Sequence, residues 1–433
     1  MTQRPASGYS FSIIDTKTDS YFTRNTLGVS TVEFFFGLGM PLVIESTFLQ
    51  LFLRSLGASS LVIGLIPTLF FLGYSLFSPL AGLLTAHLER KRPAVIATHF
   101  SSGLPILGIG ILLIFCGFIP ATLTVFLSAY ALFSVIIGLT APVWQNYLVM
   151  IFSEKKAIPA LAVMMVVQSG AKFASSFFII GMVNRYAFSA RGAGIIFTLV
   201  GLCFCSGAFM FLITRELPRP RPPVGRRSRL GFFLRAGRAV LQNRRFLFYL
   251  ASDLEVVAVV GIISFYANYA AEYCAVPPSL AAGLFVGLNY LGGLFANLVF
   301  GWFGLASLKT KCLISKGLAL TAVLLLIVSG SLASFLMVSF LVGSARAIRM
   351  LTYPPLIKRF SGLHDATPYF AIAPILTLPL SAGLPLLNGR FLDHFAYLGA
   401  LSYKLMFAGM GLLIAATLLL LIPLDFSRTN PLS

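Results

Sequence analysis

Charged side chains are scarce in this sequence. Asp, Glu, Lys and Arg together make up 10% of the 433 residues, whereas 58% of the residues are hydrophobic. A soluble domain of average composition carries about 25% charged residues. Because no water-soluble fold can bury so large an apolar fraction, the sequence predicts a protein whose solvent is the lipid bilayer.

Acidic residues are the scarcer of the two charged kinds. The chain has 13 Asp and Glu against 32 Lys and Arg, which gives a formal net charge of +19. In a soluble protein this excess would indicate nucleic-acid binding. Here the basic residues lie in short segments between apolar runs, where they encode membrane topology instead. We therefore expect no nucleic-acid partner.

Residues that hold metals or act as nucleophiles are also few. The five cysteines and four histidines are scattered, with no spacing typical of a disulfide framework or a zinc site. No nucleophile motif stands out, and no segment outside the apolar runs could form a catalytic domain. The sequence thus predicts no metal, no cofactor and no enzymatic activity.

Runs of about 20 apolar residues can cross a ~30 Å hydrocarbon core as helices. Twelve such runs are present, so we predict an all-α membrane protein with twelve transmembrane helices. The predicted helices cover residues 28–53, 60–86, 94–116, 121–149, 158–184, 193–214, 246–271, 279–304, 312–329, 332–357, 367–389 and 397–422. Only the short turn Ser329–Ser331 separates the ninth helix from the tenth.

The basic residues predict the orientation of these helices. Of the 32, 24 lie in the terminal segments and in the segments after every second helix, five lie in the opposite segments, and three lie within predicted helices. One loop of the first set is taken to contain Lys309, Lys311 and Lys316. Since positively charged loops stay in the cytoplasm, we expect a multi-pass protein of the cytoplasmic membrane with both termini cytoplasmic.

A basic, proline-rich segment at 215–245 divides the chain into two groups of six helices. We predict an N-terminal bundle at 28–214 and a C-terminal bundle at 246–422. A cytoplasmic N-terminal segment, 1–27, precedes them, and a cytoplasmic tail, 423–433, follows. The segment between the bundles is expected to be a cytoplasmic linker.

A shift of 219 residues relates the two halves. It places glycines and basic loop residues of the first half on residues of the same kind in the second. The aligned pairs are Gly64 with Gly283, Gly73 with Gly292, Gly82 with Gly301, Arg90 with Lys309 and Arg92 with Lys311. Parallel repeats of six helices characterise one transporter architecture, so the halves are expected to be pseudo-symmetric.

These features together resemble the major facilitator superfamily of transporters, over nearly the whole chain. The best local marker is the loop after the second helix, which is similar to the superfamily's Gly-x-x-x-Asp-Arg-x-Gly-Arg-Arg gating loop. The matching residues are Gly82, Arg90, Lys91 and Arg92. The motif's Asp falls on Ala86 and its second Gly on Glu89, so we expect Glu89 to supply the charge from another position. Leu56–Ser60 and Pro142–Asn146 look like segments of poorly characterised bacterial members, which imply no substrate.

The resemblance implies one central site for a small-molecule substrate, lined by the first, fourth, seventh and tenth helices and alternately open to each side. We expect a monomer that moves this solute as a secondary transporter. Symport, antiport and uniport stay open. A lipid flippase of the same fold and a non-transporting membrane sensor or assembly protein are the alternatives.

Ionisable groups at mid-membrane are functional candidates, because each costs about 2.5–3.5 kcal/mol to insert. In the first half these are Glu33 and Glu45 on the first helix and Lys172 on the fifth. Glu45 and Lys172 lie at similar depths, so we predict a functional or structural pair between them. Gln168 precedes Lys172 by one turn on the same face.

The seventh helix carries Asp253 and Glu255. They are two residues apart and face different directions, so we expect one of them to line a cavity. Tyr266, eleven residues after Glu255, returns to the same face. Since burial favours the protonated form of a carboxyl group, proton coupling is predicted through Glu33, Glu45, Asp253 or Glu255.

The tenth helix carries Arg346, Arg349 and Tyr353, whose spacing places them on one face. Arg346 lies about 21 Å along the core, too deep to reach the headgroups easily. We predict that Arg346 is the main ligand-binding or coupling cation, with the other two in support. It could hold a carboxylate or phosphate or pair with an acid of the seventh helix. Arg349 could instead extend to the membrane surface.

Further polar groups interrupt other predicted helices. They are Trp144, Gln145 and Asn146 on the fourth helix and Asn289 on the eighth. Such groups suit a small polar ligand with an apolar body. Packing explains Asn289 equally well, because Gly283-x-x-x-Gly287 nearby indicates a close helix contact.

Overall fold

The computed structural model describes residues 19–44, 47–85, 88–217, 237–361 and 367–426. Across these ranges the regular secondary structure is helical, with no strand. Twelve stretches of it are long and apolar enough to cross a membrane. The predicted all-α class and number of spans are therefore confirmed.

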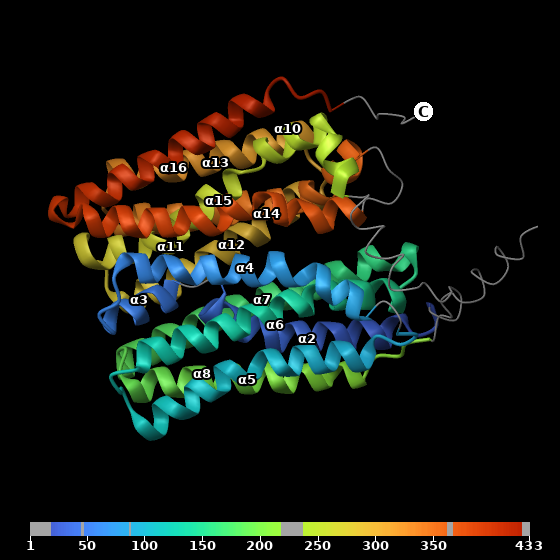
Figure 1. Ribbon diagram of the computed structural model, residues 1–433, viewed down its shortest axis with the longest axis horizontal. Helices are drawn as coiled ribbons and strands as arrows, with labels where there is room; N and C mark the ends of the chain where they lie inside the picture. Colours follow the sequence, from blue (N-terminus) through green and yellow to red (C-terminus); the bar gives the residue numbers. More distant parts are fainter. Residues whose placement is uncertain (1–18, 45–46, 86–87, 218–236, 362–366, 427–433) are drawn as a thin grey trace, which may run out of the picture.

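The helices form two bundles that lie side by side with their long axes roughly parallel (Figure 1). The first bundle contains α2 (Phe22–Val43), α3 (Thr47–Ser55), α4 (Ser60–Thr85), α5 (Arg92–Cys116), α6 (Thr122–Ile151), α7 (Glu154–Tyr186), α8 (Ala190–Phe209) and the 3-10 turn η1 (Met210–Leu212). The second contains α10 (Arg244–Ser252), α11 (Glu255–Tyr273), α12 (Pro278–Ala296), the π-helical turn η2 (Asn297–Trp302), α13 (Leu308–Val328), α14 (Leu332–Ser361), α15 (Thr367–His394), η3 (Ala396–Leu398) and α16 (Ala400–Leu421).

Short polar side chains fix where several helices begin. Ser189, Asn243 and Ser307 precede α8, α10 and α13, and each accepts a hydrogen bond from a backbone N–H three residues later, at 3.2, 3.0 and 3.2 Å. These are N-cap contacts, which satisfy donors that the first helical turn leaves unpaired. The turn predicted at Ser329–Ser331 is confirmed, because it falls between α13 and α14.

The first predicted span is not one helix, which corrects the predicted continuous run 28–53. α2 ends at Val43, α3 begins at Thr47, and residues 45–46 lie outside the described residues. Pro41 stands in the last turn of α2, where it removes one helical hydrogen bond and favours a break. The predicted pair of Glu45 with Lys172 consequently lies outside the described residues.

The seventh and ninth spans also differ from the prediction. The seventh is interrupted, because α10 ends at Ser252 and α11 begins at Glu255. The ninth, α13, begins at Leu308, four residues earlier than predicted. Lys316 therefore lies two turns inside a helix, and its assignment to a cytoplasmic loop is wrong.

The bundles meet closely at one end of the molecule, which we call the α3 side: the end that holds α3, the start of α4 and the end of α15 (Figure 1). A Cβ atom at Gly64 of α4 would collide with the carbonyl oxygen of Pro385, and Thr68 donates a hydrogen bond to the carbonyl of Ala382 at 2.6 Å. The backbones of α4 and α15 are thus in direct contact across the bundle boundary.

The predicted close contact at Gly283 and Gly287 is present, and it also joins the two bundles. A Cβ atom at Gly283 would lie 2.6 Å from the backbone oxygen of Ser176 on α7, and one at Gly287 would lie 2.8 Å from its Oγ. Glycine is required here because α7 and α12 leave no room for a side chain between them.

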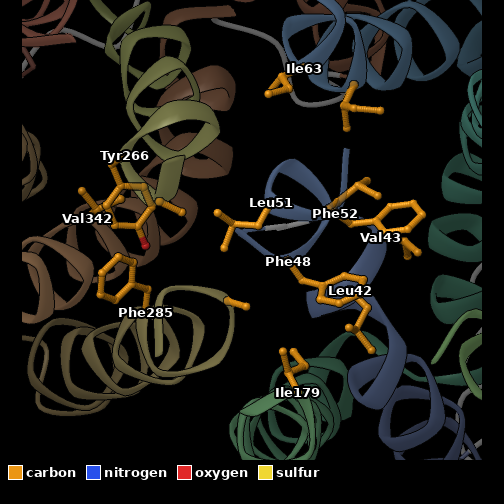
Figure 2. Close-up of a cluster of buried hydrophobic side chains, with 14 of the residues drawn as sticks. Leu42, Val43, Phe48, Leu51, Phe52, Ile63, Ile179, Tyr266, Phe285 and Val342 are labelled. Atoms are coloured by element: carbon orange, nitrogen blue, oxygen red, sulfur yellow. The ribbon is translucent and has the colours of Figure 1, made fainter. Parts of the chain in front are cut away.

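Apolar side chains fill the space between the bundles around α3. In Figure 2, Leu51 of α3 points toward Tyr266, Phe285 and Val342 of the second bundle, while Phe52 of the same helix points into the first bundle. All five side chains are almost completely buried. This packing seals the α3 side.

Polar contacts reinforce this seal. Arg54 donates from Nε to Glu272 of α11 at 2.6 Å. The carboxylate of Asp393, near the end of α15, accepts the backbone N–H groups of Ser60 and Leu61 at 2.7 and 2.8 Å. A carboxylate at the N-terminus of α4 is further stabilised by the helix dipole. Two acidic residues of the second bundle therefore hold the first bundle at its α3 side.

Candidate functional site

A cavity of about 240 Å³ lies between the two bundles. Its walls come from α3, α4 and α6 of the first bundle and from α11 and α14 of the second. The first, fourth, seventh and tenth spans, which the family resemblance implied, thus contribute to it. The second span contributes as well, through Pro67, Phe70 and Phe71 of α4.

Most of the cavity wall is apolar, and its hydroxyl groups already have hydrogen-bond partners. Tyr130 donates to the carbonyl of Val43 at 3.0 Å, and Ser264 donates to the carbonyl of Val260, one turn earlier on α11, at 2.8 Å. Within the described chain, the charged residues that line the cavity are Arg346 and Arg349.

Arg346 and Arg349 follow one another by a single turn of α14, as their spacing predicted. Nη1 of Arg346 donates a long hydrogen bond, 3.4 Å, to Oδ1 of Asn289 on α12. Asn289 therefore lies beside the candidate site as well as at a close helix contact.

Arg349 makes a forked contact with Asp253. Its Nε lies 3.1 and 3.2 Å from the two carboxylate oxygens, and its Nη2 lies 2.6 Å from Oδ2. The guanidinium carbon also lies 4.5 Å from the centre of the Tyr353 ring, within cation–π range. Arg349 thus turns toward Asp253 and the cavity rather than along the helix toward the membrane surface.

A second ion pair, Lys316 with Glu255, lies next to the pair of Arg349 and Asp253. The ammonium of Lys316 contacts the carboxylate of Glu255 and donates to the carbonyl of Ser252 at 2.6 Å. Both side chains of this pair are almost fully buried, with exposed fractions of 2% and 6%. Lys316 therefore binds both sides of the break between α10 and α11.

We call Asp253, Glu255, Lys316 and Arg349 the charge cluster. All four border one void of about 10 Å³, close to the smallest volume that holds a water molecule. Sequence reasoning missed Lys316, although the predicted helix 312–329 already included it. The two acids contact different cations, but neither lines the central cavity and both border this void, which differs from the expectation that one of them lines a cavity.

The candidates of the first half form a separate group. Gln168 donates to the carboxylate of Glu33, which also lies within electrostatic range of Lys172. Nζ of Lys172 lies 4.8 Å from the centre of the Tyr290 ring on α12. Glu33 and Lys172 are buried, but neither they nor Gln168 line the cavity. They lie instead where α7 packs between α2 and α12.

Four other predicted contact residues do not line the cavity. Gln145 and Asn146 are exposed near the end of α6, and Trp144 is half-buried beside them. Tyr266 stacks on Phe285, with ring centres 5.1 Å apart, and its hydroxyl lies 3.2 Å from Oγ of Ser339. Tyr266 thus belongs to the apolar seal of the α3 side.

The predicted gating loop is anchored within its own bundle. The backbone N–H groups of Lys91 and Arg92 donate to the carboxylate of Glu216 at 2.6 and 2.9 Å. Lys91 is buried, Glu89 and Arg90 are exposed, and Gly82 lies within α4. Glu216, which sequence reasoning did not single out, thus caps α5 and ties the loop to the chain segment after α8.

Acidic, histidine and cysteine side chains do not gather into a possible metal site anywhere in the described ranges, where no group of three was found. The described residues of the cavity and the charge cluster carry guanidinium, ammonium, amide and carboxylate groups.

Comparisons with known proteins agree with this architecture. The structure is similar to a bacterial homologue of the human lysosomal transporter Spinster, with 15% identity, coverage of 94% of this chain and 95% of that one, and a TM-score of 0.62. It is similar to the nucleoside transporter NupG at 11% identity, 92% and 99% coverage and a TM-score of 0.69. It is also similar to a bacterial homologue of the human drug peptide transporters PepT1 and PepT2. The identity is 16%, the coverage is 93% of this chain and 97% of that one, and the TM-score is 0.65.

At these identities the solved structures establish the fold alone. A search of curated proteins gives no match. The family model of the Major Facilitator Superfamily matches residues 27–361, well over half of the sequence. Together with the twelve spans in two bundles, this match shows that the chain belongs to the Major Facilitator Superfamily and is a multi-pass membrane transporter.

Proposed function

We propose that this protein is a secondary transporter of the cytoplasmic membrane that moves a small solute through the central cavity by alternating access. The observation that carries the proposal is that both bundles line this cavity while the α3 side is sealed. Rocking of one bundle against the other around a shared site would open each side in turn. Because the cavity is built within one chain, a monomer suffices for the proposed transport.

The α3 side faces outward in this proposal. The bias of basic residues places both termini in the cytoplasm, and the α3 side is the opposite end. The sealed α3 side then corresponds to a state closed to the outside. The Spinster homologue of similar fold is described as inward-facing, which supports the same state here.

Opening to the outside requires that the seal break. Arg54 must leave Glu272, and the start of α4 must leave Asp393. Charge-assisted hydrogen bonds at a solvated edge exchange readily for water. These contacts can therefore close the site without locking it.

Protons are the proposed coupling ion, and Asp253 is the coupling carboxylate we favour. Its partner Arg349 lines the cavity, so a solute that approaches Arg349 perturbs the pair directly. Glu255 is held by Lys316 away from the cavity, and Glu33 lies at another helix interface. A protonated Asp253 would release Arg349, which links proton binding to solute binding.

Transport by purified protein in proteoliposomes tests this proposal. Candidate solutes come from a thermal-shift screen of metabolite classes, since a bound ligand stabilises the folded protein. Cysteines at Thr68 and Ala382, whose contact joins the bundles at 2.6 Å, would then be cross-linked. We expect cross-linking to abolish transport and a reductant to restore it.

Unimpaired transport by fully cross-linked protein would contradict alternating access at this boundary. Single replacements Thr68→Cys and Ala382→Cys, treated with the same oxidant, are the controls. Movement of a labelled lipid between leaflets, without solute uptake, would favour the flippase alternative. If neither solute nor lipid moves, the chain is a sensor or assembly protein.

A further inference from the structure

We propose that the solute is a small organic anion, with a carboxylate, sulfonate or phosphate group on an apolar body. This inference rests on the function proposed for the cavity. It assigns a binding role to Arg346 and Arg349 together and a positioning role to Asp253.

The charge of the cavity wall is the first argument. Both charged residues that line it within the described chain are arginines, one turn apart on α14. The carboxylate of Asp253 lies behind Arg349 and is not among the lining residues. The described part of the wall therefore presents two guanidinium groups to a solute, and the carboxylate of Asp253 that pairs with Arg349 is set back from it.

The geometry of Arg349 is the second argument. A guanidinium carries five N–H donors. The carboxylate of Asp253 accepts hydrogen bonds from the N–H of Nε and from one N–H of Nη2. Nη1 forms no hydrogen bond with any part of the chain that the structure describes. Asp253 thus fixes the plane of Arg349 and leaves one edge of the fork for an anion, which guanidinium groups bind through two parallel hydrogen bonds.

The charge cluster holds this arrangement in place. Lys316 donates to the carbonyl of Ser252, the residue before Asp253, and pairs with Glu255 on the other side of the helix break. The position of Asp253 is therefore set by buried contacts, and Arg349 is oriented before any solute enters. Orientation in advance lowers the entropy lost on binding.

The rest of the cavity wall is mostly apolar, which indicates the chemistry of the rest of the solute. It includes Pro67, Phe70 and Phe71 of α4 and Val260 and Ile263 of α11. Apolar walls with a few placed polar groups are typical of small-molecule sites, which usually measure about 300–1,000 Å³. A cavity of about 240 Å³ favours a compact metabolite over a peptide or a lipid.

A charged-reagent experiment tests the inference without knowledge of the substrate. Val260→Cys would be introduced in a full-length chain whose five native cysteines are replaced by alanine. The thiol is treated with an anionic reagent, sulfonatoethyl methanethiosulfonate, and with a cationic one, trimethylammonium-ethyl methanethiosulfonate. Each rate is divided by the rate with free 2-mercaptoethanol. We expect the anionic reagent to be favoured by at least about tenfold, as in other clefts lined by one sign of charge.

Two variants should move this preference in opposite directions. Arg346→Gln should lower it several-fold, whereas Asp253→Asn should raise it, because Arg349 then lacks its counter-ion. Arg359→Gln, on the same helix but outside the cavity, is the matched control and should leave it unchanged. Because the two test variants have opposite expected signs, loss of folding in one does not imitate the result of the other.

Three other outcomes would overturn the anion inference. An equal or greater rate with the cationic reagent would overturn the anion inference and leave the transport proposal standing. A preference that neither Arg346→Gln nor Asp253→Asn changes would also overturn it, since these groups would not set the field. If the thiol reacts with neither reagent, water does not reach the cavity, and the proposed function fails with the inference.

Discussion

Replacement of Lys316 by methionine should destabilise the second bundle strongly. Lys316 is buried and contacts three groups on other helices: the carboxylate of Glu255, the carbonyl of Ser252 and the hydroxyl of Thr417. Methionine keeps most of the side-chain volume but removes the positive charge. Glu255 is then left without its partner in a site that is 6% exposed, where it either stays desolvated as a carboxylate or must take up a proton.

The expected loss of stability follows from this geometry. Removal of one member of a buried ion pair costs about 3–5 kcal/mol, because the other charge stays desolvated. If the bundle melts like a soluble domain of 150–250 residues, each kcal/mol lowers the melting temperature by roughly 2–4 °C. Lys316→Met should therefore lower the melting temperature by about 6–20 °C.

The assay is thermal unfolding of the detergent-purified chain, followed by intrinsic fluorescence. Lys358→Met, an exposed lysine at the end of α14, is the control and should shift the melting temperature little. The double variant Glu255→Gln/Lys316→Met removes both charges and should recover much of the loss. A Lys316→Met protein that melts within about 2 °C of the parent would refute the buried pair.

Three further predictions concern orientation, coupling and the seal. A single cysteine at Ser228 should react with an impermeant reagent only from the cytoplasm and one at Ala121 only from outside, and the reverse pattern would overturn the orientation. Asp253→Asn should remove solute accumulation driven by a pH gradient but keep exchange at equal concentrations, and retained accumulation would exclude this coupling group. Asp393→Asn loses charge-assisted contacts worth about 1–2 kcal/mol. The rate at which an external reagent labels Val260→Cys should therefore rise roughly 5- to 30-fold, and an unchanged rate would exclude a sealing role for Asp393.

The sequence predicts the membrane fold well because burial in lipid imposes a simple rule. A helix must be apolar over about 20 residues, so run length and loop charge suffice to count the spans. The break between α2 and α3 escaped this rule, because hydropathy measures compatibility with lipid rather than continuity of the helix. Pro41 was the available signal for the break.

The candidate site is less predictable, because the sequence gives the depth of a residue but not the direction its helix turns it. The helical period correctly grouped Arg346 with Arg349 on one face. The same reasoning could not show that Gln145 and Asn146 do not line the cavity, since the rotation of α6 about its axis depends on its neighbours. Lys316 was missed because it was assigned to a cytoplasmic loop, and because its partners lie on other helices, 61 and 64 residues away in sequence.

Distances between spin labels on the two bundles test alternating access most directly. Labels would be attached to cysteines at Ala121 and Tyr397, which are exposed at the α3 side of the first and second bundle. Pulsed electron resonance then measures their separation in detergent and in lipid at several pH values. The account predicts two populations, the longer of which gains at the expense of the shorter when Asp253 is replaced by asparagine or a transported solute is added. A single distance distribution that no pH, solute or replacement changes would contradict it.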